Sequence, residues 1–178
     1  MTTNVRRVVP RPHPATLSDA ALLRECETSF GRASGPGGQH RNKVETAAAL
    51  EHGPTGLRAS ASERRRQSEN RRTALRRLRI ELAIAIRTPV DPARHRRSPL
   101  WESRRQGRQM SINPKHRDYP ALLAEALDVV VALDYDLGAA AGVLSVSMSQ
   151  LAKLLRHQRR AFALVNDGRT ARGLPGLK

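Results

Sequence analysis

Aromatic residues are scarce in this sequence: Phe, Tyr and Trp together make up 3% of the 178 residues. So few rings argue against a surface that stacks the bases of single-stranded nucleic acid. Cys26 is the only cysteine, which excludes a disulfide framework and a cysteine-based metal centre and fits a reducing, cytoplasmic compartment. The six histidines lack paired metal-ligand spacing, and no apolar run is long enough to span a membrane. We therefore expect no metal, no cofactor and no membrane partner.

Acidic residues are also too few to balance the basic ones. The chain carries 32 Lys and Arg against 16 Asp and Glu, for a formal net charge of +16. Residues 58–87 contribute +7 and residues 88–119 contribute +5, so three quarters of the excess lies between positions 58 and 119. Almost all of it is arginine, whose planar guanidinium suits phosphates and stacks on bases. This charge favours a polyanionic partner, most simply RNA.

The N-terminal third predicts an arm, a short helix and a strand. Residues 1–16 hold three prolines and three arginines, and they predict a mobile, extended arm. Ser18 and Asp19 supply the chemistry of a helix start. Cys26, Thr28 and Phe30 then alternate along a predicted strand from Glu25 to Arg32.

The segment after this strand, Ser34 to His40, reads SGPGGQH and packs three glycines and a proline into four positions. Glycine reaches backbone angles that a Cβ forbids, and it lets another molecule approach the main chain closely. Taken alone, such a segment is ordinarily a surface turn. Its basic neighbours, Arg32, Arg41 and Lys43, favour instead a loop that meets a polyanion.

Two interpretations of the alanine-rich segment 44–52 remain open from the residues alone. Alanine favours a helix, whereas the turn at 53–56 and the apolar start of 57–61 favour a hairpin with two strands. Ser62 is predicted to cap a long helix that ends near Arg87, with Leu75, Leu78 and Leu82 on its core face. Its remaining surface is rich in arginine, including Arg76, Arg77 and Arg79, and only three acids lie within 58–87.

The last third predicts a basic linker and then a helical module. Residues 88–119, with four prolines and clustered arginines, predict little regular structure, held down by Trp101. Residues 120–133, 137–143, 148–158 and 160–166 are predicted as helices. Ala141, Val146 and Leu151 have the spacing of a helix-turn-helix, whose second helix would expose Gln150, Lys153, Arg156 and His157. The same spacing also occurs in a plain three-helix packing unit.

Three segments in order resemble the GGQ domain of class I peptide chain release factors and their ribosome-rescue relatives. They are RASGPGGQHRN at 32–42, HGPTG at 52–56 and RRQSENR at 65–71. The resemblance runs from about residue 17 to 87. It has two departures: Arg41 stands where the family usually has an apolar residue, and Arg66 stands where it usually has a serine. It implies an α+β fold, a small sheet with a long packed helix, and makes segment 45–52 a strand. The predicted domains are an arm at 1–16, the GGQ catalytic domain at 17–87, a basic linker at 88–119 and an all-α, helix-turn-helix-like module at 120–178.

The resemblance also implies an activity, which is hydrolysis of the ester between nascent peptide and tRNA on the ribosome. The implied catalytic residues are Gly37, Gly38 and Gln39. The implied partners are rRNA of the peptidyl-transferase centre, peptidyl-tRNA and a glutamine methyltransferase acting on Gln39, and we expect the chain to be a monomer. Charge and the neighbourhood of the loop give the predicted RNA-binding residues: Arg32, Arg41, Lys43, Arg64, Arg65, Arg66, Arg71, Arg72, Arg104, Arg105 and Arg108.

Codon-reading release factors carry a separate decoding domain. Here 33 residues precede Ser34, and one small helical module follows the linker. We therefore expect codon-independent rescue of stalled ribosomes. Two alternatives remain: a nucleic-acid-binding adaptor with a non-catalytic GGQ domain, and a release factor acting with a separate decoding partner.

Overall fold

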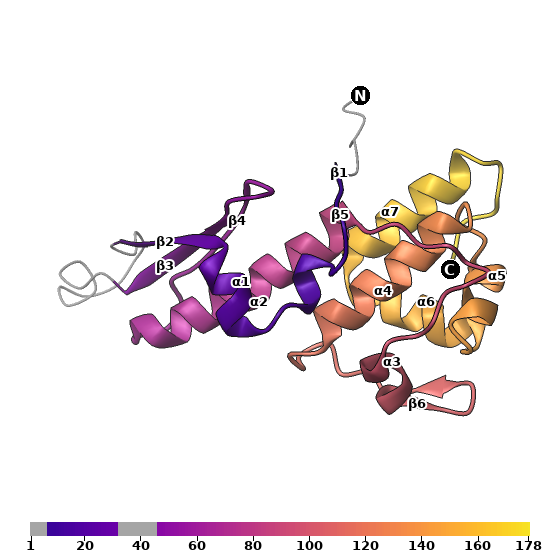
Figure 1. The fold of residues 1–178 in the computed structure, drawn as a ribbon, viewed down its shortest axis with the longest axis horizontal. Coiled ribbons are helices and arrows are strands. Elements are labelled where there is room, and N and C mark those ends of the chain that lie inside the picture. The colour runs from indigo at the N-terminus through magenta and orange to yellow at the C-terminus, as the bar shows by residue number, and fades with distance from the viewer. Residues whose placement is uncertain (1–6, 32–45) are drawn as a thin grey trace. The chain divides into compact units, whose positions relative to one another are not determined.

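The computed structural model of the chain describes residues 7–31 and 46–178 (Figure 1). The chain divides into two compact units. We call Pro14–Leu82 the sheet unit, and the N-terminal segment up to His13 together with Ala83–Lys178 the helical unit. The architecture is α+β, with a small sheet and a long helix followed by a helical C-terminal part, as predicted.

The sheet unit is built on a three-stranded antiparallel sheet. Its strands, in both chain order and spatial order, are β2 (Cys26–Gly31), β3 (Ala47–His52) and β4 (Leu57–Ala61). Ala48, Leu50 and His52 are buried and alternate with less buried neighbours along β3, so one face of the sheet enters the core. The segment is therefore a strand, as the resemblance implied, because burial between two partner strands outweighs the helix preference of alanine.

The turn between β3 and β4 is fixed by His52, which is 1% exposed. Its imidazole hydrogen-bonds with Thr55 Oγ1 at 2.7 Å and with Glu25 Oε2 at 2.9 Å. Gly56 N donates to the His52 carbonyl at 2.7 Å, and the φ of +66° at Gly56 favours glycine. The histidine and threonine of the HGPTG segment thus tie this turn to the residue that precedes β2.

The helices of the sheet unit are the 3-10 turn η1 (Pro14–Thr16), α1 (Asp19–Arg24) and α2 (Gln67–Ala85), whose last turn belongs to the helical unit. Ser18 Oγ caps α1 by accepting from Ala21 N at 3.1 Å, as the sequence indicated. The predicted start of α2 at Ser62 is wrong, because the helix begins at Gln67. Ser62 N instead donates to Glu63 Oε2 at 3.1 Å. Leu75, Leu78 and Leu82 are buried, as predicted.

The expectation of a mobile arm is wrong for residues 7–13, which pack into the helical unit. β1 (Arg7–Val8) pairs in parallel with β5 (Ile86–Arg87). Val9 N donates to the Arg87 carbonyl at 3.0 Å, and the His13 ring is within 3.2 Å of the Ile86 carbonyl. His13 is only 5% exposed, and its burial lowers the pKa of the imidazole below its ordinary value of 6.5.

This buried histidine makes the stability of the helical unit depend on pH. The folded state favours neutral His13, so the unfolded state binds more protons once the pH falls below about 6.5. We expect the free energy of unfolding to fall from that pH down to the lowered pKa of His13. Urea unfolding at several pH values, followed by Trp101 fluorescence, measures this, because Trp101 lies in the same unit. In His13→Gln, which keeps a side-chain donor but does not titrate, the loss should be smaller, and equal pH profiles would contradict the assignment.

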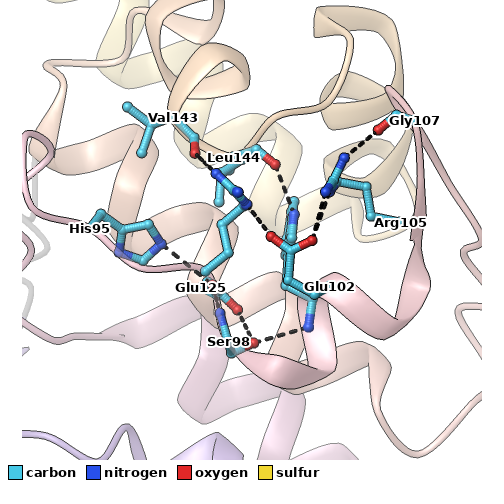
Figure 2. A network of polar contacts seen from close by, with 10 residues as sticks. His95, Ser98, Glu102, Arg105, Gly107, Glu125, Val143 and Leu144 are labelled. Carbon is cyan, nitrogen blue, oxygen red and sulfur yellow. Dashed lines mark hydrogen bonds and ion pairs between the residues drawn. The ribbon is translucent and has the colours of Figure 1, made fainter.

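Segment 88–119 has more regular structure than the sequence predicted. It contains α3 (Pro99–Arg104) and a hairpin of β6 (Arg105–Gln106) and β7 (Gln109–Met110). Trp101 is fully buried, and its Nε1 donates to the Leu144 carbonyl at 2.9 Å. Figure 2 shows how polar contacts add to this anchor. Ser98 donates twice to Glu125, from its backbone N at 2.8 Å and from its Oγ at 2.5 Å.

The last third forms four helices: α4 (Tyr119–Ala132), α5 (Leu137–Val143), α6 (Met148–Arg156) and α7 (Arg159–Thr170). Helices α5 and α6 bend by 103° at the break between them, and Ala141, Val146 and Leu151 are all buried there. Ser145 replaces the glycine usual in such a turn and adopts a φ of +53°. The helix-turn-helix geometry is therefore present. No single described helix is long and apolar enough to cross a membrane; only α5 and α6 counted together across their bend have that length and composition.

Candidate functional site

The predicted catalytic residues Gly37, Gly38 and Gln39, and the basic neighbours Arg32, Arg41 and Lys43, lie outside the described residues. The structure does describe both ends of the segment that carries them. Gly31, the last residue of β2, is paired in register with Ala47, the first residue of β3. The segment therefore leaves the sheet and returns to it at the ends of two neighbouring antiparallel strands.

One buried side chain fixes the returning end. Asn70 is fully buried in the first turn of α2, and its Nδ2 donates to the Thr46 carbonyl at 2.6 Å. The same side-chain amide also binds the backbone of Arg64 on both sides: Nδ2 donates to the Arg64 carbonyl at 2.9 Å, and Oδ1 accepts from Arg64 N at 2.9 Å. Asn70 thus joins the start of β3, the approach to α2 and the helix itself. This is a physical reason for an asparagine at the end of the RRQSENR segment.

We expect Asn70→Asp to destabilise the sheet unit by about 2 kcal/mol or more. The carboxylate still accepts from Arg64 N, but it loses both donated bonds and faces two carbonyl oxygens at a buried site. Hydrogen exchange of the β3 amides measures the effect, because Trp101 lies in the other unit and does not report on it. Ser68→Ala, on the exposed side of the same turn, is the matched control. Wild-type protection in Asn70→Asp would rule out this anchor.

Five arginines lie close to this anchor in the sequence, in the approach to α2 and in its first two turns. All five are exposed, and none forms an ion pair within the part of the chain that the structure describes: Arg64, Arg65, Arg66, Arg71 and Arg72. Unpaired guanidiniums on an exposed surface keep their full attraction for a polyanion. These five predicted RNA-binding residues are therefore exposed in the way that contact with RNA requires.

Two neighbouring arginines that the sequence placed on the same basic surface serve the fold instead. Arg79 is 8% exposed, and its guanidinium donates to the Ala15 carbonyl at 3.0 Å and to Asp19 Oδ1 at 2.7 Å. Arg77 donates to the Ser60 carbonyl at 2.6 Å and pairs with Glu63. Sequence periodicity assigned both to the surface because their partners lie 60 and 14 residues away.

The predicted RNA-binding residues of the linker fall into two groups. Arg104 pairs with Asp118 at 2.6 Å, and Arg105 pairs with Glu102 at 2.7 Å. Hydrogen bonds from Arg97 and then from Arg105 lower the pKa of Glu102, so this carboxylate stays charged and holds them (Figure 2). Arg108 is exposed and forms no ion pair with the described residues.

No group of three His, Cys, Asp or Glu side chains within residues 7–31 and 46–178 is arranged to hold a metal ion. The described part of the site therefore consists of a strand pair that frames the glycine-rich segment, an asparagine anchor and an exposed arginine cluster. Sequence reasoning found the arginines but missed the anchor. The position of Asn70 within the RRQSENR segment was the available signal.

Residues 22–120 match the protein family described as the RF-1 domain, and this match spans more than half of the chain. The chain belongs to the RF-1 domain family. The matched range contains the three segments on which the resemblance rests, and it extends through the linker to Pro120. Family membership thus covers both the frame of the glycine-rich segment and the arginines that follow it.

Individual relatives match over shorter ranges. The chain is 41% identical to peptide chain release factor 1 of Malacoplasma penetrans over 83 aligned positions, covering 40% of this chain and 23% of that protein. It is 51% identical to peptide chain release factor 1 of Ureaplasma parvum serovar 3 with the same coverage. Peptide chain release factor 2 of Lactiplantibacillus plantarum is 49% identical over 51 positions, covering 29% of this chain and 14% of that protein. The chain thus spans less than a quarter of the length of these relatives.

Proposed function

We propose that the chain promotes hydrolysis of peptidyl-tRNA on the ribosome, acting as a peptide release factor. The observation that carries this proposal is the RF-1 domain match over 22–120, which includes the GGQ segment and its frame. In this reaction the oxygen of water bonds to the ester carbonyl carbon. The bond to the tRNA ribose oxygen breaks, and that oxygen takes up a proton. The partners are the rRNA of the peptidyl-transferase centre and peptidyl-tRNA.

The chemistry assigned to the loop is that of the backbone. Gly37 and Gly38 allow a main-chain course and a closeness to rRNA that side chains would prevent. The main-chain N–H of Gln39 donates to the oxyanion that develops on the ester carbonyl, and one such donor is worth about 3 kcal/mol. The Gln39 side-chain amide shapes a pocket that admits water and excludes larger nucleophiles. The protein supplies no titratable general base in this scheme.

The described residues support delivery of the loop. The register of Gly31 with Ala47 and the bond from Asn70 to Thr46 hold both ends of the segment on one sheet. The exposed arginines beside the anchor and Arg108 supply the attraction to RNA, with Arg32, Arg41 and Lys43 adding to it from within the segment. These cations deliver and orient the loop and take no part in the bond changes.

We further propose that release is independent of the codon, as in rescue of stalled ribosomes. Phosphate contacts position a protein on nucleic acid, whereas reading a codon requires contacts with base edges. The cations of the site that form no ion pair with the described residues are arginines, which suit phosphates. The charge excess of +12 between residues 58 and 119 also comes almost entirely from arginine. The described surface thus fits binding to rRNA irrespective of the message.

The test compares ribosomes carrying a labelled peptidyl-tRNA and one of three messages: truncated before the A site, a sense codon there, or a stop codon there. We expect release from the truncated complex at a rate at least equal to that with a stop codon. Release that requires a stop codon would contradict codon independence and favour a decoding partner. No release from any complex, together with tight binding to duplex DNA, would favour the adaptor.

Three narrower proposals accompany this function. Gln39 is a substrate for a glutamine methyltransferase, which mass spectrometry of the natively expressed chain tests directly. The chain acts in the cytoplasm, where its ribosomal partner is found, and it works as a monomer. Sedimentation of the purified chain checks the oligomeric state.

A further inference from the structure

Two long stretches of the helical unit contain basic residues and no acid. Residues 103–117 hold four arginines and Lys115, and residues 137–166 hold Lys153 and three arginines, with no Asp or Glu in either stretch. Local pairing therefore cannot neutralise these cations. Some are held by acids just outside the stretches, as Arg104 is by Asp118.

The fold brings these two stretches together. Ser147 N, at the N-cap of α6, donates to the Arg108 carbonyl at 2.9 Å, so the β6–β7 hairpin lies against the start of α6. Ser149, Lys153 and Arg156 are exposed and spaced four and three residues apart, so they share one face of α6. We call Arg108 and these three residues the α6–hairpin surface. Neither Arg108 nor Lys153 forms an ion pair within the part of the chain that the structure describes, while the Arg156 guanidinium donates to the Lys178 carbonyl oxygen.

The composition of this surface indicates how it would contact nucleic acid. The Gln150 side chain, the amide most suited to reading a base edge, is half-buried with its Oε1 inside the protein. The remaining groups are cations and a hydroxyl, which suit phosphates. Sequence-specific reading of a DNA groove is therefore disfavoured, although the helix-turn-helix geometry alone would suggest it.

The aromatic residues of the helical unit argue against a single strand. Trp101, Tyr119 and Tyr135 are at most 1% exposed, and the remaining ring, Phe162, has the Arg156 guanidinium 5.5 Å from its centroid. No freely exposed ring is left among the described residues of this unit to stack unpaired bases. A double helix, which presents its phosphates outward and its bases stacked inside, fits this surface better.

We propose that the α6–hairpin surface binds a double-helical segment of RNA through its phosphates. The choice of RNA over DNA rests on the proposed ribosomal function, whereas the choice of a duplex rests on the surface itself. A-form RNA has a deep, narrow major groove that side chains do not read, so RNA helices are bound mostly by shape and backbone contacts. The proposal gives the helix-turn-helix an RNA-binding role, which peptide release alone does not require.

The test measures binding of the full chain to a labelled RNA duplex of about 20 base pairs by fluorescence anisotropy. The duplex should bind with a Kd that rises with salt, and Arg108→Glu combined with Lys153→Glu should weaken binding about tenfold or more. Arg94→Glu combined with Arg96→Glu makes the same change in net charge in the same unit, outside both stretches, and should weaken it less than about threefold. Equal losses of affinity in the two double variants would contradict the assignment of RNA binding to the α6–hairpin surface.

Two further probes test the choice of ligand. DNA duplex of the same sequence and single-stranded RNA should both bind more weakly than the RNA duplex. Tighter binding of the DNA overturns the RNA assignment, and equal binding of single-stranded RNA overturns the duplex assignment. Gln39→Pro should bind the duplex with the same Kd as the wild type. Duplex binding can therefore be confirmed or contradicted even if the chain does not release peptide. Folding of each variant is checked by Trp101 fluorescence and thermal unfolding.

Discussion

Replacing Gln39 by proline is expected to lower the rate of peptide release by about 100-fold or more, because proline removes the main-chain N–H assigned to the oxyanion. Replacing Gln39 by alanine keeps that N–H and should retain much of the rate with water. Because alanine leaves a larger pocket, the same variant should admit hydroxylamine as a nucleophile more readily than the wild type. Single-turnover release from stalled ribosomes measures both variants.

This pair separates backbone from side-chain chemistry. Binding to ribosomes, measured by co-sedimentation, should be similar in both variants, so a difference in rate reports on the reaction. If Gln39→Pro released peptide as fast as Gln39→Ala, the N–H of residue 39 would have no role in the reaction. If alanine abolished release while the hydroxylamine reaction also disappeared, the side chain rather than the main chain would be the essential group.

Replacing Asp128 by alanine is expected to destabilise the helical unit by about 3–5 kcal/mol. Asp128 and Arg87 are each 4% exposed, and Arg87 Nη1 donates to Asp128 Oδ1 at 3.0 Å. The carboxylate also accepts from Thr88 N at 3.2 Å and from Thr88 Oγ1. Its loss leaves a guanidinium buried without its counter-charge, which costs more than the pair itself contributes.

Urea unfolding followed by Trp101 fluorescence measures this loss, since Trp101 and Asp128 lie in the same unit. The double variant Asp128→Leu with Arg87→Met removes both charges and should be more stable than Asp128→Ala. A double variant less stable than Asp128→Ala would show that the pair itself, and not the unpaired charge, dominates. A loss below about 1 kcal/mol in Asp128→Ala would mean that Arg87 is not buried as the structure has it.

The elements with strong local signals were predictable from the sequence. Helix α5 was predicted at its observed bounds, and the structure shows that the Asp136 side chain caps the start of this apolar segment. Strand β2 followed from the alternation of Cys26, Thr28 and Phe30. Strand β3 did not, since its alanines favour helix, and the resemblance was needed to identify it.

The failures share one physical cause, which is that a contact with residues far away in the sequence leaves no local signal at the position that makes it. Arg79 was read as surface because its partner Asp19 lies 60 residues away. Ser62 looked like a helix cap because its sequence neighbours fit, but Asn70 holds Arg64 in a non-helical approach. The arm at 7–13 looked mobile because its pairing with Ile86 and Arg87 is absent from its own composition.

The catalytic claim is tested most directly by release of labelled peptide from ribosomes stalled on a truncated message, with the wild-type chain and Gly38→Ala side by side. We predict rapid release by the wild type and a rate at least about 100-fold lower in Gly38→Ala, because the added Cβ blocks the close approach of the main chain to rRNA. Equal ribosome binding by the two chains shows that only the reaction has changed. Release by Gly38→Ala at the wild-type rate, or no release by the wild type from any ribosomal complex, would contradict the account.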